Sequence, residues 1–467
     1  MVFASLFFLY AFLPANLILY FMTKNRAIRN AVLILFSLFF YAWGEPVWVT
    51  LLIFSATIDY IHGLIIEKYP GGIQAKLAVV SSLVLNLGLL GVFKYSGFIV
   101  ENINALCGTT FNVPSFALPI GISFYTFQTI SYTIDVYWGK VKAQHNYAKF
   151  FMYVSLYSQL VAGPIVRYAD VAREVDFRQE TAKDISAGIT RFLVGLTKKV
   201  FIANTAGSFA DSYLTGDLLS RSTAAMWFGA LMFTIQIYYD FSGYSDMAIG
   251  LGQMFGFHFL ENFNYPYIAK TASDFWRRWH MSLGAFFRDY VYIPLGGNRK
   301  HQYLNLFIVW FLTGLWHGAS WNFILWGLWF GVLIIAERLF LKKVLEKLPA
   351  FFSHVYLLLA VVLGWVLFYF TDLTQVWNCL KVMFGAAGTG LWDLGLEIQL
   401  QNNLFWLIAA IVFCMPIVPT VKKYLEAHPK LFAVSGYVQI PANVVMLAVC
   451  TALLVGQSYN AFLYYRF

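Results

Sequence analysis

Apolar runs of about 20 residues recur along this chain, and they constrain its fold more than any other feature of the sequence. Because a lipid bilayer offers the backbone no hydrogen-bonding partners, only helices or a closed barrel can cross it. The runs are longer and more continuous than the alternating strands of a barrel. The sequence therefore predicts an all-α, polytopic membrane protein with about 11 spanning helices and additional re-entrant or interfacial helices.

The composition and charge support a multi-pass protein of the plasma (cytoplasmic) membrane. Charged residues make up only 12% of the chain, whereas soluble domains carry about 25%. We assign the net charge of +9 to positive-inside topology and to anionic lipid or ligand, and not to nucleic acid. The basic loops at 23–29, 68–76 and 338–348 are therefore expected on the cytoplasmic side. The four scattered cysteines predict neither a disulfide framework nor a metal site.

A single transmembrane domain covering residues 1–467 is expected, because the sequence shows no fixed repeat, low-complexity tract or soluble domain boundary. Asp59 and His62, three residues apart on one predicted helix, are expected to form a local hydrogen-bonded pair. The helix that opens at Pro119 is rich in polar side chains and is expected to face the bundle centre. Other spans are expected near 1–22, 30–43, 48–66, 77–93, 186–213, 352–371, 404–419 and 437–460, with an outside loop at 378–403.

One histidine, His317, lies inside the very apolar stretch Asn305–Glu337. An ionisable side chain in the hydrocarbon region is unfavourable unless it faces protein or water, so it is a candidate functional residue. Its neighbours Gly314 and Gly318 are small and permit close approach of another helix or of a substrate. The alternative interpretation is a core histidine that is hydrogen-bonded to a carbonyl.

Polar side chains also interrupt the apolar run that begins at Ala224. Asp240 and Asp246 lie six residues apart, and Gly243 between them allows a helix break. Two interpretations remain open: the helix ends at the interface with Asp246 capping the next helix, or the carboxylates form the polar wall of a substrate channel. The side chains predicted to line that channel are Gln236, Asp240, Ser242, Trp316 and Ser320.

No full span fits between residues 258 and 303, where basic and aromatic residues are interleaved. Ser273 or Asp274 can cap a short helix that carries His280, and such an element is tolerated at membrane depth only if it is buried in protein or lines water. Arginine forks match phosphate geometry, so the segment predicts a cytoplasmic pocket for a phosphorylated donor. The alternative is a belt against lipid headgroups. The residues predicted to bind the donor are Arg277, Arg278, Trp279 and Arg288.

Three motifs stand out in the second half of the chain: Asp274–Leu283, Phe287–Gly297 and Leu315–Gly318. They resemble the motifs of the membrane-bound O-acyltransferase (MBOAT) superfamily, and within it those of the branch of bacterial alginate O-acetyltransferases. The resemblance covers essentially the whole chain. Further similar stretches are Leu118–Tyr125, Val161–Arg167, Gln236–Gly250 and the terminal Phe462–Phe467.

This resemblance implies a ring of helices around a thinned centre, with a central funnel from one side and a tunnel from the other. It implies that His317 is the catalytic histidine and His280 the second motif histidine. It also implies transfer of acetyl from a cytoplasmic thioester, expected to be acetyl-CoA, toward the outer face. There a partner of the SGNH-esterase type, or an accessory secreted protein, passes the acetyl group to an alginate-like or cellulose-like exopolysaccharide. D-alanyl transfer to teichoic acid from an acyl carrier, and acylation of peptidoglycan, are the alternatives.

The chemistry of acyl transfer to a hydroxyl also favours histidine. An imidazole with an ordinary pKa of about 6.5 can take the hydroxyl proton as the carbonyl is attacked, a contribution of about 10²–10⁴-fold. His317 is predicted to be this general base, although a covalent acyl-histidine route remains open. His280 could polarise the thioester carbonyl, orient His317 or bind the pantetheine arm. No metal is expected, because no Cys, His or carboxylate cluster has ligand spacing.

Two functions of other classes remain open from the sequence. A secondary transporter would often show inverted repeats and interrupted helices in both halves, and the first half holds no second copy of the Trp316-His317 element. A non-catalytic scaffold for a secreted esterase is the other possibility. Release of free thiol from acetyl-CoA would distinguish an enzyme from both.

Overall fold

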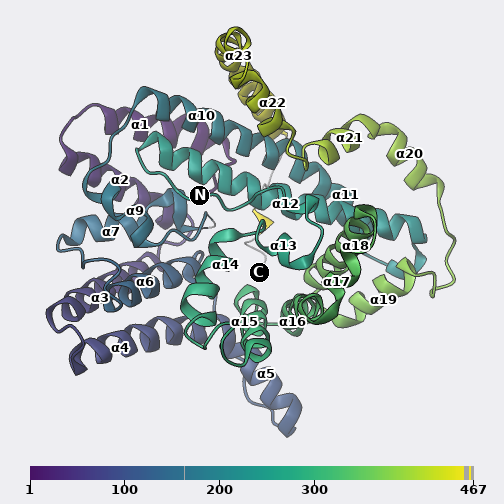
Figure 1. Cartoon of the computed structure of the whole chain (residues 1–467), viewed down its shortest axis with the longest axis horizontal. Helices are drawn as coiled ribbons and strands as arrows, with labels where there is room; N and C mark the ends of the chain where they lie inside the picture. The colour runs from purple at the N-terminus through teal and green to yellow at the C-terminus, as the bar shows by residue number, and fades with distance from the viewer. Residues whose placement is uncertain (162, 457–461, 464–467) are drawn as a thin grey trace. The chain divides into compact units, whose positions relative to one another are not determined.

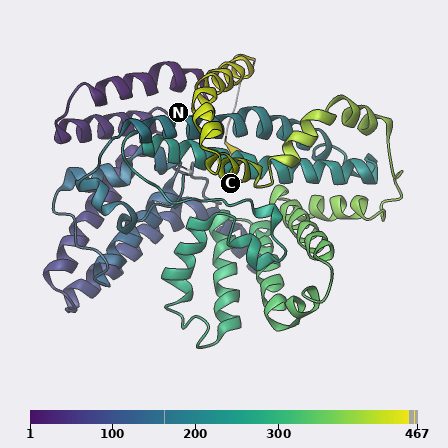
Figure 2. The same cartoon turned by 45° about the horizontal axis from the view of Figure 1, so that its top comes forward.

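The computed structural model describes every residue except 162, 457–461 and 464–467. The described residues form helices joined by turns and loops (Figures 1 and 2), which confirms the all-α prediction. Two compact units are present. The first consists mainly of Met1–Phe192 and Tyr244–Glu261, and the second mainly of Leu193–Gly243 and the residues from Asn262 onward. The single transmembrane domain stays a prediction.

In the first unit, α3 packs against α4 and α6 through a buried polar network. Asp59 of α3 accepts a hydrogen bond from Nδ1 of His62 at 3.0 Å, which confirms the predicted pair, and another from Asn86 of α4 at 2.7 Å. Nearly all of α6 is buried, so it faces the protein interior as expected. The helices of this unit are η1 (Phe8–Phe12), α1 (Leu13–Phe21), α2 (Arg26–Ala42), α3 (Val49–Lys68), α4 (Ile73–Leu90), η2 (Gly91–Tyr95), α5 (Ser96–Cys107), α6 (Ile122–Tyr137), α7 (Tyr147–Ser155), α8 (Tyr157–Leu160) and α9 (Tyr168–Asp176).

In the second unit, α15 and α16 form a tight antiparallel hairpin. Gly314 faces the backbone oxygen of Phe323, and Gly327 faces that of Trp310, so a side chain at either glycine would collide with the partner helix. α18 packs on α16, and α13 contacts both. The helices of this unit are η3 (Lys198–Ala203), α11 (Asn204–Leu214), η4 (Leu218–Ser220), η5 (Pro266–Ile268), α13 (Ala272–Trp276), α14 (Met281–Phe287), η6 (Arg288–Tyr292), α15 (Gln302–His317), α16 (Trp321–Ala336), η7 (Glu337–Leu341), α17 (Lys342–Leu345), α18 (Ala350–Tyr369), α19 (Leu373–Met383), α20 (Leu394–Asn402), α21 (Leu404–Val412), α22 (Ile417–Glu426) and α23 (Pro429–Val455).

Five helices among the described residues are long and apolar enough to cross a membrane, or six if the bent pair of α21 and α22 counts as one span. Helices α6 and α15 have 16 residues each, fewer than the roughly 20 that cross a bilayer. The structure thus supports a multi-pass membrane protein, while the larger number of about 11 spans remains a prediction. The five spans are Val49–Lys68, Ile73–Cys107, Trp321–Leu345, Ala350–Tyr369 and Pro429–Val455.

Of the two interpretations of the segment around Gly243, the one in which the helix ends there is wrong. α12 (Thr223–Met254) continues through Gly243 without a break, and its residues belong to both units. Asp246 therefore caps no following helix; its carboxylate pairs with Arg191 of α10 (Ala182–Thr197) at 2.6 Å. A glycine permits a helix to break but does not require it, because packing against other helices can stabilise a helix that contains a glycine.

Two predictions near the C-terminus also need correction. The segment 378–403, expected to be a loop, holds most of α19 and all of α20, because Asp372 and Asp393 cap these helices. The expected span 404–419 is divided into α21 and α22, which are bent by 64° at Pro416, where the proline ring prevents a continuous helix. Positions 457–460 of the last predicted span, residue 162 and the terminal residues 464–467 lie outside the described residues.

Candidate active site

His317 is the last residue of α15 and lies against α16 and α18. Its side chain is buried, and its ring meets Trp326 edge to face at 4.8 Å and Phe368 at 5.4 Å between centroids. Gly318 follows in an extended conformation, and a side chain at that glycine would collide with the ring of Phe323. The small residues beside His317 therefore close the helical hairpin and place the imidazole inside an aromatic enclosure.

His280 is buried at the start of α14, where its backbone adopts the left-handed conformation with φ 44° and ψ 54°. Its Nδ1 lies 3.1 Å from Oδ1 of Asn262. The backbone N–H of Ser282 at 3.2 Å and the Ser282 hydroxyl at 2.9 Å donate to the same Oδ1, which identifies this atom as the amide oxygen. Because an amide oxygen only accepts, His280 donates from Nδ1 and carries its lone pair on Nε2.

Nε2 of His280 is buried and has no hydrogen-bond partner among the residues that the structure describes. Burial lowers the pKa of His280, which lies outside the helices that can span the membrane, to about 3, so the imidazole is neutral. To polarise a carbonyl, Nε2 of His280 would have to donate a hydrogen bond, and in this tautomer it carries no proton. It can instead accept a hydrogen bond from an N–H or O–H group.

Trp316 is a neighbour of both histidines. Its ring centroid lies 6.0 Å from that of His280 and 5.0 Å from that of His317. Phe241 of α12 covers His280 edge to face at 4.7 Å. The two imidazoles thus share one aromatic wall in the second unit, and the predicted channel residue Trp316 is that wall.

The other predicted channel residues have separate surroundings. Asp240 is buried in an ion pair with Nζ of Lys199 from η3, at 2.5 Å. Gln236 and Ser242 each have a buried side-chain oxygen without a hydrogen-bond partner among the described residues. Ser320 occupies the position before α16 but makes no capping hydrogen bond. Gln236, Asp240 and Ser242 all lie on α12, whereas Ser320 precedes α16, and a channel lined by these side chains stays a prediction.

Two of the three arginines predicted to bind the donor pair with neighbouring carboxylates, and the third is exposed. Arg278 pairs with Asp274 at 3.1 Å, and Arg288 pairs with the adjacent Asp289 at 2.7 Å. Arg277 follows the last residue of α13, and its side chain is exposed. Among the described residues, no group of three or more His, Cys, Asp or Glu side chains is placed to hold a metal ion.

The predicted cap of the motif helix is wrong by two or three positions. The hydroxyl of Thr271 accepts from the backbone N–H of Asp274 at 3.0 Å, so Thr271 caps α13 and neither Ser273 nor Asp274 does so. The helix ends at Trp276, and His280 lies beyond it. The chain changes direction between α13 and α14, at the left-handed residue His280. One continuous helix from Thr271 through His280 would not allow this change of direction.

α13 is anchored at both ends. The buried carboxylate of Glu337 accepts from the backbone N–H groups of Ala272 and Ser273 and from the Ser273 hydroxyl, the last two at 2.9 and 2.6 Å. Past the other end, Trp279 is buried and stacks on Phe275 at 5.5 Å between ring centroids. Trp279, predicted to bind the donor, therefore lies in the aromatic core that supports the motif.

Replacement of Glu337 by leucine is expected to lower the melting temperature of the detergent-purified protein. Two backbone donors at the start of α13 would lose their acceptor, at about 1–3 kcal/mol for each buried donor. Glu337→Gln keeps one acceptor oxygen and should lose less. Glu346→Leu, at an exposed carboxylate, is the control. Equal melting temperatures for all three variants would contradict the anchoring role.

Three residues that fix the site were missed by sequence reasoning: Asn262, Lys199 as the partner of Asp240, and Glu337. Lys199 carried a signal, because a lysine inside an apolar span requires a counter-charge. Asn262 lies 18 residues before His280, and no spacing rule links an asparagine to a histidine at that separation. Glu337 stands at the end of the apolar stretch, and no sequence pattern links its carboxylate to the backbone of Ala272 and Ser273.

Comparison with known proteins identifies the class. The family model described as "MBOAT, membrane-bound O-acyltransferase family" matches residues 141–380, which include both histidines and Asn262. The chain belongs to this family. It is therefore a membrane-bound O-acyltransferase, and the shared aromatic wall with its two buried imidazoles is its candidate catalytic centre.

Individual relatives extend the similarity beyond the family model. A probable alginate O-acetylase AlgI of Pseudomonas aeruginosa is 42% identical over 405 residues, covering 84% of this chain and 76% of that protein. Its counterpart in Azotobacter vinelandii is 38% identical over 100% of both chains. A peptidoglycan O-acetyltransferase of Helicobacter pylori is 34% identical over 84% of this chain and 81% of that protein.

Proposed function

We propose that this enzyme passes an acetyl group from a cytoplasmic thioester to an acceptor on the outer side of the membrane, for O-acetylation of an alginate-like exopolysaccharide. The observation that carries the proposal is that His280 and His317 are both neighbours of the Trp316 ring, at 6.0 and 5.0 Å between centroids. The full-length similarity to the probable alginate O-acetylase of Azotobacter vinelandii supports the choice of acyl group and polymer.

His317 is the general base in this proposal. It takes the proton of the acceptor hydroxyl while the oxygen attacks the thioester carbonyl. The new C–O bond forms, the C–S bond breaks, and the proton passes from His317 to the leaving thiolate. Trp326, whose ring contacts His317, has a buried Nε1–H without an acceptor among the described residues. This N–H is a donor available to the carbonyl oxygen as it gains negative charge.

His280 acts on the donor in the same proposal. Its Nε2 accepts a hydrogen bond from an amide N–H of the pantetheine arm, and this contact holds the thioester near His317. The donor is acetyl-CoA in the first instance, with an acetylated carrier protein as the alternative. An SGNH-esterase-type or accessory secreted protein receives the acetyl group.

The membrane architecture in this proposal is one domain of about 11 spans around a central funnel and tunnel. These two openings would admit the donor from the cytoplasmic side and the acceptor from the outer side.

Free thiol production is the direct test of the activity. Purified protein in proteoliposomes that is given acetyl-CoA should release CoA thiol and transfer acetyl to a soluble acceptor domain or to oligosaccharide. An acetylated carrier protein, supplied in parallel, identifies the preferred donor. A transporter or a scaffold would release no thiol from either donor, and that result would reject the proposal.

Peptidoglycan is the second candidate polymer, because the Helicobacter pylori relative is a peptidoglycan O-acetyltransferase. Deletion of this gene from its host should remove ester-linked acetate from one polymer only. Mass spectrometry of purified exopolysaccharide and of purified peptidoglycan from the same cells distinguishes the two candidates. Loss of acetate from peptidoglycan alone would reassign the acceptor while leaving the acyl-transfer chemistry in place.

Arg277→Ala is expected to raise the apparent KM for acetyl-CoA more than it lowers kcat, as the loss of uniform substrate binding does. Arg277 is exposed, whereas Arg278 is already paired with Asp274, so Arg278→Ala should have the smaller effect. Lys347→Ala, at an exposed lysine, is the charge-matched control. Wild-type KM values for both arginine variants would make these side chains structural.

A further inference from the structure

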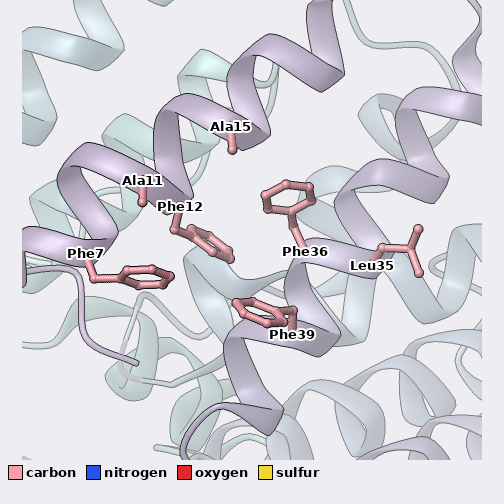
Figure 3. A pocket seen from close by; sticks show the side chains of 7 residues that line it. All are labelled: Phe7, Ala11, Phe12, Ala15, Leu35, Phe36 and Phe39. Atoms are coloured by element: carbon pink, nitrogen blue, oxygen red, sulfur yellow. The ribbon is translucent and has the colours of Figure 1, made fainter.

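An apolar groove runs along the hairpin of η1, α1 and α2 in the first unit (Figure 3). Its volume is about 500 Å³, within the range of about 300–1,000 Å³ that is usual for ligand pockets. Phe7, Ala11 and Ala15 line one side, and Leu35, Phe36 and Phe39 line the other. The two alanines make the groove, because they leave space between larger side chains that are substantially exposed.

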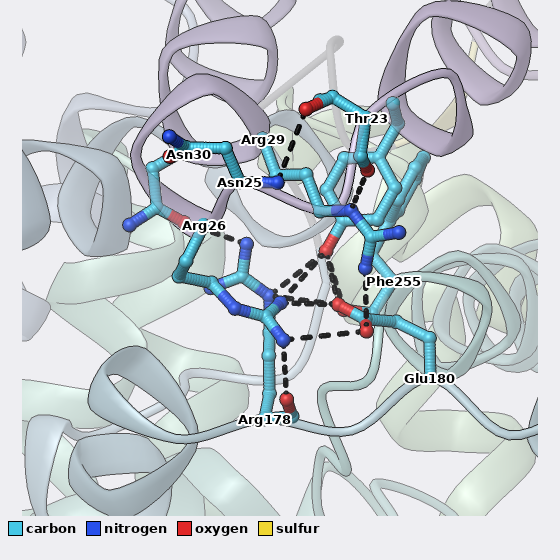
Figure 4. A network of polar contacts seen from close by, with 9 residues as sticks. Thr23, Asn25, Arg26, Arg29, Asn30, Arg178, Glu180 and Phe255 are labelled. Atoms are coloured by element: carbon cyan, nitrogen blue, oxygen red, sulfur yellow. Dashed lines mark hydrogen bonds and ion pairs between the residues drawn. The ribbon is translucent and has the colours of Figure 1, made fainter.

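The turn of the same hairpin lies beside a cationic cluster (Figure 4). Arg26 and Arg29, in the first turn of α2, and Arg178, in the loop before α10, converge on the single carboxylate of Glu180. Arg29 is 2.8 Å and Arg178 is 3.6 Å from its oxygens. The cluster therefore carries two more positive than negative charges, and the nearby Lys24 in the turn is exposed.

Arg178 shows that this cluster lacks counter-charge. Its side chain is fully buried, and it donates to Tyr20 at 3.0 Å and to Asn30 at 2.6 Å. Its Nη1 is buried without a hydrogen-bond partner among the described residues. Burial also lowers the pKa of Arg178, as it does for cations removed from water. Buried charges are normally balanced; here three arginines share one carboxylate, and an anion would balance the remaining positive charge.

We propose that the hairpin binds an anionic phospholipid, with its phosphate at Arg26 and Arg29 and an acyl chain in the groove. Arginine forks match phosphate geometry. Ala15 lies six residues before the end of α1 and Leu35 nine residues after the start of α2, so the groove begins about 9–14 Å along the hairpin from the turn. A lipid whose phosphate is at the turn directs its chains along this path.

The groove and the charges can be tested separately in the full-length, detergent-purified protein. Native mass spectrometry would measure binding of palmitoyl-oleoyl phosphatidylglycerol and of the matching phosphatidylcholine. Wild type should bind phosphatidylglycerol about tenfold or more tightly than phosphatidylcholine, because both lipids offer a phosphate but the positive choline group of phosphatidylcholine is repelled by the arginines. Ala11→Trp fills the groove and should weaken the binding of both lipids. Ala105→Trp, at an exposed alanine of α5, is the matched control and should change neither.

Arg26→Gln should reduce the preference for phosphatidylglycerol, because it lowers the positive charge that repels choline, and it should weaken the binding of phosphatidylglycerol more than that of phosphatidylcholine. Lys68→Gln removes one exposed positive charge at the end of α3 and should leave the preference intact. Coenzyme A is the third probe, because it offers phosphates without a lipid chain. Displacement of phosphatidylglycerol by coenzyme A would assign the cluster to the acyl donor instead. Equal affinity for both lipids, or unchanged binding in Ala11→Trp, would overturn the lipid site.

Discussion

Replacement of His317 by alanine is expected to abolish acetylation of the exported polymer while leaving the amount of enzyme in the membrane unchanged. The general base contributes about 10²–10⁴-fold to such a reaction, and the neighbouring rings of Trp316, Trp326 and Phe368 cannot take its place as a base. Removing an ionisable group from an apolar helix does not hinder insertion. The measurements are ester-linked acetate per sugar residue and immunoblot of the membrane fraction.

His428→Ala, at an exposed histidine of the second unit, is the control and should acetylate normally. His280→Ala is expected to impair acetylation but to retain a measurable fraction, because an interaction with the donor can be partly replaced by water. The reverse result, with His317→Ala active and His280→Ala inactive, would exchange the proposed roles. Full activity in both variants would remove the histidines from the mechanism.

The second large effect is expected at Asn262. Asn262→Leu removes the acceptor that holds the proton of His280 on Nδ1, and it leaves a buried donor unpaired at a cost of about 1–3 kcal/mol. The imidazole is then free to carry its proton on Nε2, and Nε2 can no longer accept the hydrogen bond proposed from the pantetheine arm. The rate of thiol release from acetyl-CoA should fall by about tenfold to a hundredfold.

Asn262→Asp is the informative comparison, because a carboxylate also accepts from Nδ1 of His280 and from Ser282. This variant should keep the tautomer and retain more activity than Asn262→Leu. Melting temperatures measured in detergent separate loss of activity from loss of fold. Equal activity of the leucine and aspartate variants, with both well folded, would show that the tautomer of His280 does not matter for the reaction.

The sequence predicted those parts of the fold that depend on local composition. Long apolar runs predicted α3 and α18, because an apolar helix of about 20 residues is stable in a membrane whether it faces protein or lipid. The division of the apolar stretch 305–337 into α15 and α16 was not predicted. The Asp59 and His62 pair was predictable because both residues lie on one face of a helix. The sequence left open whether the helix ends at Gly243, because the packing of other helices on α12 decides whether it bends or continues.

The candidate site was predictable in its titratable groups and not in their partners. Both histidines stand out in an apolar or aromatic context. Asn262 does not, since hydrogen bonding between side chains 18 residues apart depends on the left-handed turn at His280. Glu337 likewise receives its role from the approach of α13, which sequence spacing does not encode. The pairing of Lys199 with Asp240 could have been inferred only from the cost of a buried charge.

The π-helical segment η3, Lys198–Ala203, changes how this region must be compared with its relatives. A π-helical turn holds one more residue than an α-helical turn, and one residue corresponds to a rotation of about 100° around a helix with 3.6 residues per turn. A helical wheel drawn through residues 186–213 as one helix therefore misorients one end relative to the other. Aligned positions share a face only when the helical segments before and after η3 are projected separately. Lys199, which pairs with Asp240, lies within η3 itself, so neither projection places it.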